Sequence, residues 1–269
     1  SSDVCSSDLV LADVVWVIRN FKPDVIICRF PTTGEGGHGH HTASAILAVE
    51  AFAAAADPKR FPEQLKSTNT WQAKRIFWNT FNFGGLNTTA ENQLKIDVGG
   101  YNPLLGKSYG EIAAESRSCH KSQGFGSAKT RGEAIEYFKQ LGGDTAKLDL
   151  FEGINQQWNR YSLLAKFDLM ITNCIKQFNV SSPEKSMPSL LAIYQQLQQL
   201  NEKNADLVYW KNQKLKELQE IITACAGLWI EASAADYSAI PGKEIQLNAQ
   251  IICRNKLNIR LKKIQFLNG

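Results

Sequence analysis

The chain has 269 residues, of which 43% are hydrophobic and 21% are charged, a composition typical of a globular protein with a sizeable core. This length allows one large domain or two ordinary ones. The 30 Lys and Arg residues exceed the 26 Asp and Glu residues by only four, which does not favour a nucleic-acid-binding protein. No apolar run approaches the roughly 20 residues that a transmembrane helix needs. We therefore expect no nucleic-acid partner and no membrane span.

The first residues do not fit the pattern of the rest. Residues 1–8 show no hydrophobic periodicity and no apolar segment of a signal peptide, and we interpret them as a scar from cloning or from sequence assembly. Residues 9–19 carry apolar side chains at helical spacing, which predicts a helix, and Pro23 cannot continue it. A domain of this type should open with a strand, so we expect the sequence to be incomplete at its N-terminus.

A loop rich in glycine and histidine lies between a predicted strand and a predicted helix. Residues 25–30 form an apolar run typical of a parallel strand buried on both faces, and the alanine-rich residues 42–56 predict a helix. Three of the four histidines in the chain, His38, His40 and His41, lie between them. Ligands of open α/β sheets bind beyond the carboxyl ends of the strands, so the sequence predicts a site in this loop.

His38 and His41 are three positions apart, so their imidazoles can converge on one point if the helix begins near His41. Neutral imidazole is a common metal ligand, and a catalytic zinc usually takes three protein ligands and one water. Two histidines supply part of such a site. The alternative is a solvated turn or a remnant of a histidine tag. A tag, however, would be a longer run of histidines and would not lie between a strand and a helix.

The loop resembles the His-Pro-Asp-His motif of the PIG-L (LmbE-like) N-deacetylases. The four positions of that motif fall on His38, Gly39, His40 and His41. The resemblance covers roughly residues 10–160 and continues through residues 57–65, Trp71, residues 108–111 and residues 120–123. It implies a Rossmann-like parallel sheet with flanking helices. It also implies a zinc-dependent hydrolase that removes an acetyl group from an N-acetylglucosamine-type sugar or glycoconjugate.

By this resemblance His41 is a ligand of Zn²⁺. His38 is then the catalytic imidazole that stabilises the tetrahedral intermediate or protonates the leaving amine. The sequence departs from the family in two places, because Gly39 and His40 replace Pro-Asp, and residues 1–33 contain no A-H-P-D-D-E motif. That motif supplies the other metal ligands and the aspartate general base. We therefore expect the chain as written to bind zinc weakly and to show little or no turnover.

Further candidates for the site lie in the middle of the chain. Residues 73–81 predict a strand, and residues 82–107 predict a long loop of the kind that often binds ligands. Asp97, Tyr101 and Asn102 in this loop are candidates to line a sugar pocket, and an ordinary surface loop is equally compatible with them.

A helix is predicted from Ser108 to about Gln123, because Ser108 and Glu111 have the spacing of a capping box. His120 near its end is a candidate for substrate binding, with a structural role as the alternative. Residues 134–141 predict a further strand.

The last part of the chain has a different pattern. Residues 161–226 predict amphipathic helices, one of them starting at Ser186 and Pro188. Residues 228–232, 245–251 and 257–262 predict the first strands of an immunoglobulin-like β-sandwich, which needs about seven. The six cysteines include no C-x-x-C pair, and the apolar surroundings of Cys28 and Cys225 favour buried free thiols over disulfides.

The predicted organisation is thus an incomplete deacetylase domain over residues 9–160, a helical linker over 161–226 and a partial sandwich over 227–269. The expected partner is a small-molecule or glycan substrate. A non-catalytic carbohydrate-binding or scaffold protein of the same fold, and a hydrolase of another amide or ester, are alternatives. An attached sandwich favours an extracytoplasmic location, either periplasmic or secreted, over a cytoplasmic one. The sugar and the oligomeric state stay open.

Overall fold

The computed structural model describes residues 2–124 and 126–264, without the side chains of residues 2–7 and 123. The chain divides into two compact units, residues 1–154 and residues 155–269, and each has a core of its own. Among the described residues, no helix is both long enough and apolar enough to cross a membrane.

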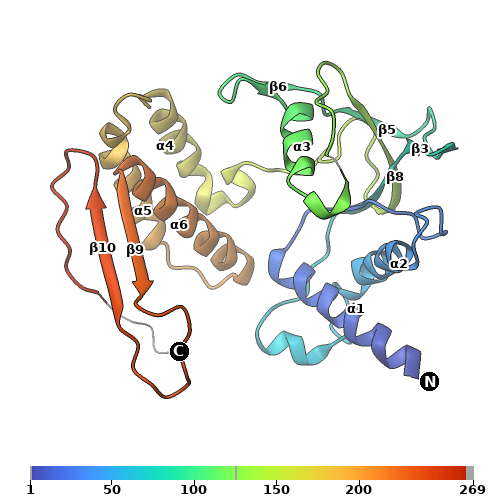
Figure 1. Cartoon of the computed structure of the whole chain (residues 1–269), viewed down its shortest axis with the longest axis horizontal. Helices are drawn as coiled ribbons and strands as arrows, with labels where there is room; N and C mark the ends of the chain where they lie inside the picture. The colour runs from blue at the N-terminus through green and yellow to red at the C-terminus, as the bar shows by residue number, and fades with distance from the viewer. Residues whose placement is uncertain (1, 125, 265–269) are drawn as a thin grey trace. The chain divides into compact units, whose positions relative to one another are not determined.

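The first unit is built on a four-stranded sheet with the order β1-β2-β8-β5 (Figure 1). Strands β1 (Val25–Cys28) and β2 (Arg75–Thr80) are parallel, as predicted, whereas β8 (Ile135–Gly143) is antiparallel to both β2 and β5 (Leu94–Asp97). The sheet is therefore mixed, and the prediction of a parallel sheet is wrong for β8. The hydrophobic pattern of a strand fixes which side chains face the core, but it does not fix the direction of the strand.

The segment predicted as a long loop contains short strands. Strands β3 (Asn82–Phe83) and β4 (Leu86–Asn87) pair in a hairpin, and β6 (Tyr101–Asn102) pairs with β7 (Lys107–Ser108). Gly84 and Gly85 connect the first hairpin with φ values of +64° and +83°, as a two-residue type I′ turn requires. Another strand of this segment, β5, belongs to the main sheet. The prediction of one long loop over residues 82–107 is therefore wrong.

Helices α1 (Ser2–Phe21) and α2 (Gly39–Ala54) pack on each other. Leu11, Val15 and Ile18 of α1 meet the small side chains of α2 in one buried cluster. Alanine at the contact lets the two helix backbones approach closely. The backbone of residues 2–8, which the sequence analysis interprets as a scar, is helical and continuous with the rest of α1.

A buried guanidinium holds the end of α2. Arg19 is 0% exposed, and its Nε donates to the carbonyl oxygen of Ala55 at 3.1 Å. Its Nη2 donates to the carbonyls of Ala54, Asp57 and Arg60 at 3.2, 2.9 and 2.8 Å. The last carbonyl groups of a helix have no hydrogen-bond donor within the helix, so Arg19 of α1 supplies donors to carbonyl groups at the end of α2.

Helix α3 (Tyr109–Ser118) begins with the predicted capping box. The Ser108 hydroxyl accepts from the backbone N–H of Glu111 at 3.2 Å, and the Glu111 carboxylate accepts from the N–H of Ser108 at 3.0 Å. The helix is shorter than predicted, because it ends at Ser118 and His120 has non-helical backbone angles of −82° and 71°. A single turn of 3₁₀ helix follows, so the extension to residue 123 was wrong.

The second unit contains the predicted helices. These are α4 (Ala165–Lys176), α5 (Met187–Gln198) and α6 (Ala205–Cys225), which share one hydrophobic core that includes Phe167, Ile193 and Leu197. Helix α5 starts after Ser186 with Pro188 in its first turn, as predicted. Short 3₁₀ helices lie at Pro62–Lys66 and Lys121–Gln123 in the first unit, and at Trp158–Arg160, Ser162–Leu164 and Pro183–Ser186 in the second.

The second unit ends in a two-stranded antiparallel hairpin of β9 (Leu228–Ala234) and β10 (Leu247–Cys253) (Figure 1). The first two predicted strands are thus confirmed. Residues 257–262 form no strand, and no second sheet covers the hairpin among the described residues, so the immunoglobulin-like sandwich is not seen. Alternating apolar residues favour strands, but a strand also needs a partner to hydrogen-bond with.

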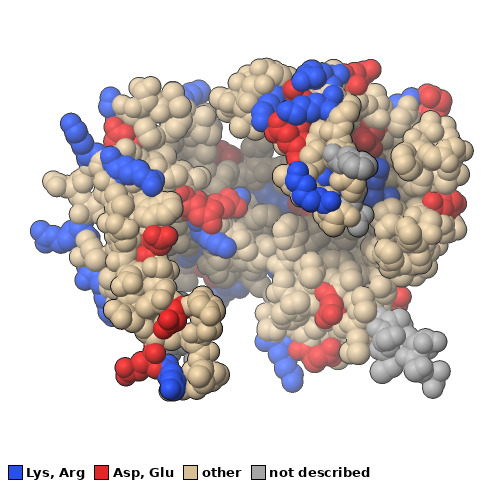
Figure 2. Space-filling view, in the orientation of Figure 1, with Lys and Arg blue, Asp and Glu red and all other residues tan. Residues whose placement is uncertain are grey.

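The described cysteines are free thiols, and Cys28 and Cys225 are buried, as predicted. The charged side chains are mixed on the face drawn in Figure 2, where Lys and Arg lie beside Asp and Glu. The clearest group surrounds α3, where Lys107 and Lys129 both contact Glu115 at 2.7 Å, and Arg131 contacts Glu111 at 2.7 Å. These ion pairs tie residues 129–131 to the helix.

Candidate functional site

The histidine loop follows the carboxyl end of β1 and leads directly into α2. Gly34 and Gly37 have φ values of +95° and +79°, a left-handed conformation that glycine adopts without steric cost. The N–H of Gly37 donates to the carbonyl of Gly34 at 3.1 Å, which closes a tight turn. His38 then takes an extended conformation as the N-cap of α2. The turn thus brings His38, His40 and His41 to the first turn of the helix.

His41 is held in a defined orientation. Its imidazole stacks on the phenyl ring of Phe30, with ring centroids 3.8 Å apart and planes 3° apart. Its Nδ1 lies 3.1 Å from the carbonyl oxygen of Gly36. A carbonyl oxygen only accepts hydrogen bonds, so this contact assigns the proton of the neutral ring to Nδ1 and leaves the lone pair on Nε2. Metal-binding histidines commonly donate their other ring N–H in this way.

The three imidazoles form one cluster at the start of α2. The ring centroid of His41 lies 5.1 Å from that of His38 and 4.4 Å from that of His40, and the rings of His38 and His40 are 5.5 Å apart. His38 and His40 are exposed, and His41 is half-buried. Histidine nitrogens are among the usual protein ligands of zinc.

The donor set is nevertheless incomplete. In the part of the chain that the structure describes, no group of three or more His, Cys, Asp or Glu side chains is placed to hold a metal ion. The nearest carboxylate in sequence, Glu35, accepts from the hydroxyl of Thr33 at 2.5 Å, and this hydrogen bond lowers the pKa of Glu35 below its ordinary value. A general base works best with a pKa near the working pH, so Glu35 is poorly suited to that role.

A polar group that the sequence analysis did not predict lies across the ends of three strands. Arg29, directly after β1, donates to the side-chain oxygen of Asn79 on β2 and lies 3.8 Å from the carboxylate of Glu136 on β8. The Asn79 amide also donates to Glu136 at 2.7 Å. The register of the strands would have been needed to find this group, because its members are far apart in the sequence.

A pocket of about 430 Å³ lies beside β2 and β8. Its walls combine aromatic side chains with amides, a mixture that suits a ligand with both apolar faces and hydroxyl groups. Its lining includes Trp78, Thr88, Asn92, Gln93, Lys139 and Gln140.

The predicted substrate-binding residues have local structural partners. The Asp97 carboxylate accepts from the N–H groups of Gly99 and Ala134 at 2.8 and 2.9 Å, and these bonds lower its pKa. The Asn102 side chain accepts from two N–H groups of the following turn. Tyr101 and His120 are exposed. Among the described residues, no hydrogen bond or ring contact joins these four side chains to the histidine cluster. Their role in substrate binding stays a prediction.

No protein-family model, no curated protein and no solved structure matches this chain.

Proposed function

We propose that this chain is part of a metal-dependent hydrolase that removes the acetyl group from an N-acetylglucosamine-type sugar or glycoconjugate. The observation that carries the proposal is the presentation of His41. No hydrogen bond involves its Nε2 among the described residues, its Nδ1 contacts the Gly36 carbonyl, and its ring stacks on Phe30 shortly after a parallel strand. The resemblance of residues 38–41 to the motif of the PIG-L N-deacetylases supports the same assignment.

Zinc bound at such a site would polarise the amide carbonyl and acidify a bound water. Among the described residues, His41 is the proposed ligand, and His38 and His40 lie beside it. They do not place the carboxylate ligand and the general base that the reaction requires. We therefore propose no complete reaction sequence for these residues, and we expect the chain alone to bind zinc weakly and to turn over little or no substrate.

His38 is suited to a second role in the reaction. It is exposed at the N-cap of α2, and its ring centroid lies 5.1 Å from that of His41. An imidazole there can donate a hydrogen bond to a developing oxyanion or give a proton to the departing amine. Hydrolysis of the acetamide by water yields acetate and the free amino sugar, so the proton that His38 delivers would go to the sugar nitrogen.

Zinc titration of the purified chain tests the role of His41. We expect weak binding that His41→Ala abolishes and His120→Ala leaves unchanged, because His120 is an exposed histidine of the same unit outside the cluster. Zinc that stays bound in stoichiometric amount through dialysis would contradict the expectation of weak binding. Equal loss in both variants would contradict the assignment of His41.

A continuous long read of the encoding DNA through the junction before Leu9 tests the enzyme assignment. A reading frame that continues upstream into a strand followed by A-H-P-D-D-E would support the assignment. A protein that includes this segment should release acetate from N-acetylglucosamine-type substrates in the presence of zinc. A frame without these residues would argue against the deacetylase and favour the second candidate.

The second candidate is a non-catalytic carbohydrate-binding protein, and the pocket beside Trp78 is the observation that favours it. Aromatic side chains and amides are suited to the faces and hydroxyls of sugars. Asn92 is an exposed residue of its lining, so Asn92→Ala should weaken sugar binding without unfolding the chain. Binding of chitooligosaccharides that needs no metal and leads to no acetate release would support this candidate over the enzyme.

A further inference from the structure

The helical unit contains a second cavity that is independent of the proposed deacetylase site. It has a volume of about 390 Å³ and is lined by side chains of α4, α5 and α6 and of the segments next to them. The cavity is partly open to solvent, and sites for small molecules in proteins are usually clefts of roughly 300–1,000 Å³ lined mainly by apolar side chains. A cavity of this size between three helices is therefore a candidate binding site.

The size of the cavity limits what it can hold. The cavity is more than twice the size of an apolar cavity of about 150 Å³ that holds benzene. It thus has room for a small molecule.

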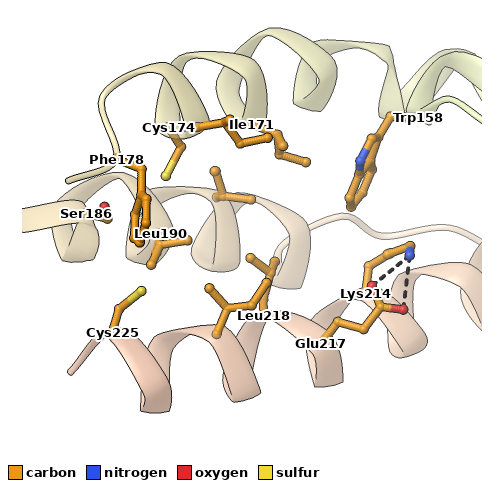
Figure 3. Close-up of a pocket in the computed structure, with 13 residues that line it drawn as sticks. Trp158, Ile171, Cys174, Phe178, Ser186, Leu190, Lys214, Glu217, Leu218 and Cys225 are labelled. Atoms are coloured by element: carbon orange, nitrogen blue, oxygen red, sulfur yellow. Dashed lines mark hydrogen bonds and ion pairs between the residues drawn. The ribbon is translucent and has the colours of Figure 1, made fainter. Parts of the chain in front are cut away.

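The chemistry of the lining changes from one end to the other (Figure 3). Ile171 and Leu218 line the middle with aliphatic side chains, and Leu190 lies beside Phe178 at the end opposite Lys214. Lys214 and Glu217 lie at one end, beside Trp158, with the lysine Nζ 2.7 and 3.0 Å from the two carboxylate oxygens. A ligand that matches this lining has an apolar body and a single polar end.

The ion pair determines which polar end fits. The ammonium of Lys214 is already neutralised by Glu217, so an anionic head group would be repelled by the carboxylate as well as attracted by the ammonium. An uncharged group can accept a hydrogen bond from the ammonium or donate one to the carboxylate without this penalty. An uncharged polar head group therefore suits the part of the cavity at Lys214 and Glu217 better than an anionic one.

The other rim of the cavity is apolar and open. Ile175, Phe178 and Ile221 line it and are 69%, 49% and 47% exposed. Exposed apolar side chains around a hollow are typical of binding sites. We propose that this cavity binds a linear aliphatic chain with an uncharged polar head, such as a fatty alcohol or an acyl ester. The chain lies between the helices and the head lies at Lys214 and Glu217.

A fluorescent probe measures this binding in the full chain. N-phenyl-1-naphthylamine, whose emission rises in apolar sites, should bind saturably and be displaced by 1-decanol. Ile175→Glu places a charge at the rim and should weaken probe binding about tenfold. Leu169→Glu is the matched control, because Leu169 is 67% exposed on the same helix but does not line the cavity.

Thiol labelling locates the ligand. Cys174 lines the cavity, whereas Cys119 and Cys253 are exposed cysteines outside it. Saturating 1-decanol should slow alkylation of Cys174 by N-ethylmaleimide several-fold and leave the other two rates unchanged, as read by mass spectrometry of the peptides. Ile175→Glu and Leu169→Glu both replace exposed side chains, so circular dichroism should show that each variant stays folded.

Three results would overturn the proposal. The first is equal probe binding by Ile175→Glu and Leu169→Glu, and the second is labelling of Cys174 that 1-decanol does not slow. The third is displacement of the probe by the decanoate anion at lower concentration than by 1-decanol, which would reject the uncharged head group.

Discussion

The imidazole of His41 lies flat on the phenyl ring of Phe30, with ring centroids 3.8 Å apart. Phe30 lies two residues after the end of β1, whereas His41 belongs to the first turn of α2, so this contact ties the two sides of the histidine loop together. The stacking and the hydrogen bond to Gly36 together fix both the plane and the tautomer of the ring.

The first prediction concerns this stacking. Phe30→Leu keeps an apolar side chain but removes the flat surface, so the His41 ring should become less ordered. We expect the zinc affinity to fall about tenfold, the lower limit for loss of a group that orients a metal ligand. Phe83→Leu in the same unit, at a side chain that is 81% exposed, should leave the affinity unchanged. Isothermal titration calorimetry with both variants would measure this, and similar affinities would argue against an orienting role.

The second prediction concerns the glycines of the loop. A Cβ atom on Gly36 would lie 3.0 Å from Cδ1 of Phe30 and 3.3 Å from Cβ of His41, so Gly36→Ala should displace the stacked rings and weaken zinc binding. Gly39→Ala should preserve zinc binding, because no atom lies within 4 Å of a Cβ at that position. A stronger effect at Gly39 than at Gly36 would show that the loop is held differently.

The third prediction concerns the stability of the first unit. Arg19→Lys removes most of the hydrogen bonds to the end of α2 and leaves buried carbonyl oxygens without donors. We expect a loss of about 3 kcal/mol or more in the free energy of unfolding, from the desolvated acceptors. Arg60→Lys is the control, since Arg60 makes a surface ion pair with Glu50, and such pairs contribute about 0–1 kcal/mol. Urea denaturation of the two variants would compare the losses, and equal values would contradict the assigned role.

The fourth prediction concerns pH. Hydrogen bonds from Lys107 and then from Lys129 lower the pKa of Glu115 from 4.5 to about 2. Because this pKa is lower in the folded state, the stabilisation by these ion pairs is present above about pH 4.5 and is lost as the pH falls toward 2.

Side-chain NMR titration of Glu115 should report this low pKa, and Lys129→Met should raise it. Lys121→Met should not, because Lys121 is exposed and no ion pair joins it to Glu115 in the described part of the chain. An unperturbed pKa in the unsubstituted protein would show that the ion pairs do not persist in solution.

The sequence predicts the elements around the histidine loop well, because their signals are local. The apolar run of β1, the alanines of α2 and the capping box at Ser108 each determine structure within a few residues. The amphipathic pattern of the last helices is equally local, and all three helices are present.

The features that the sequence does not predict depend on contacts between distant residues. The direction of β8 depends on its partners, and the role of Arg19 depends on carbonyl groups 35 or more positions away. Likewise, no group of three or more His, Cys, Asp or Glu side chains among the described residues is placed to hold a metal ion, and only a structure shows whether a distant carboxylate reaches the three histidines. The prediction of a strand at residues 257–262 is wrong for the same reason. Its alternating pattern indicates which side chains would face a core, but not which strand it would pair with.

The position of Arg19 also determines how this protein can be shortened. A fragment that begins at β1 would retain the glycine turn and all three clustered histidines, yet the carbonyl groups at the far end of α2 would lose their donor. Helix α2 is about 24 Å long, so unfolding would start at its C-terminal end, far from His41. It would leave a shorter helix to hold the His41 imidazole in place. A minimal fragment for metal-binding studies must therefore include α1, although no residue of α1 lies in the histidine loop.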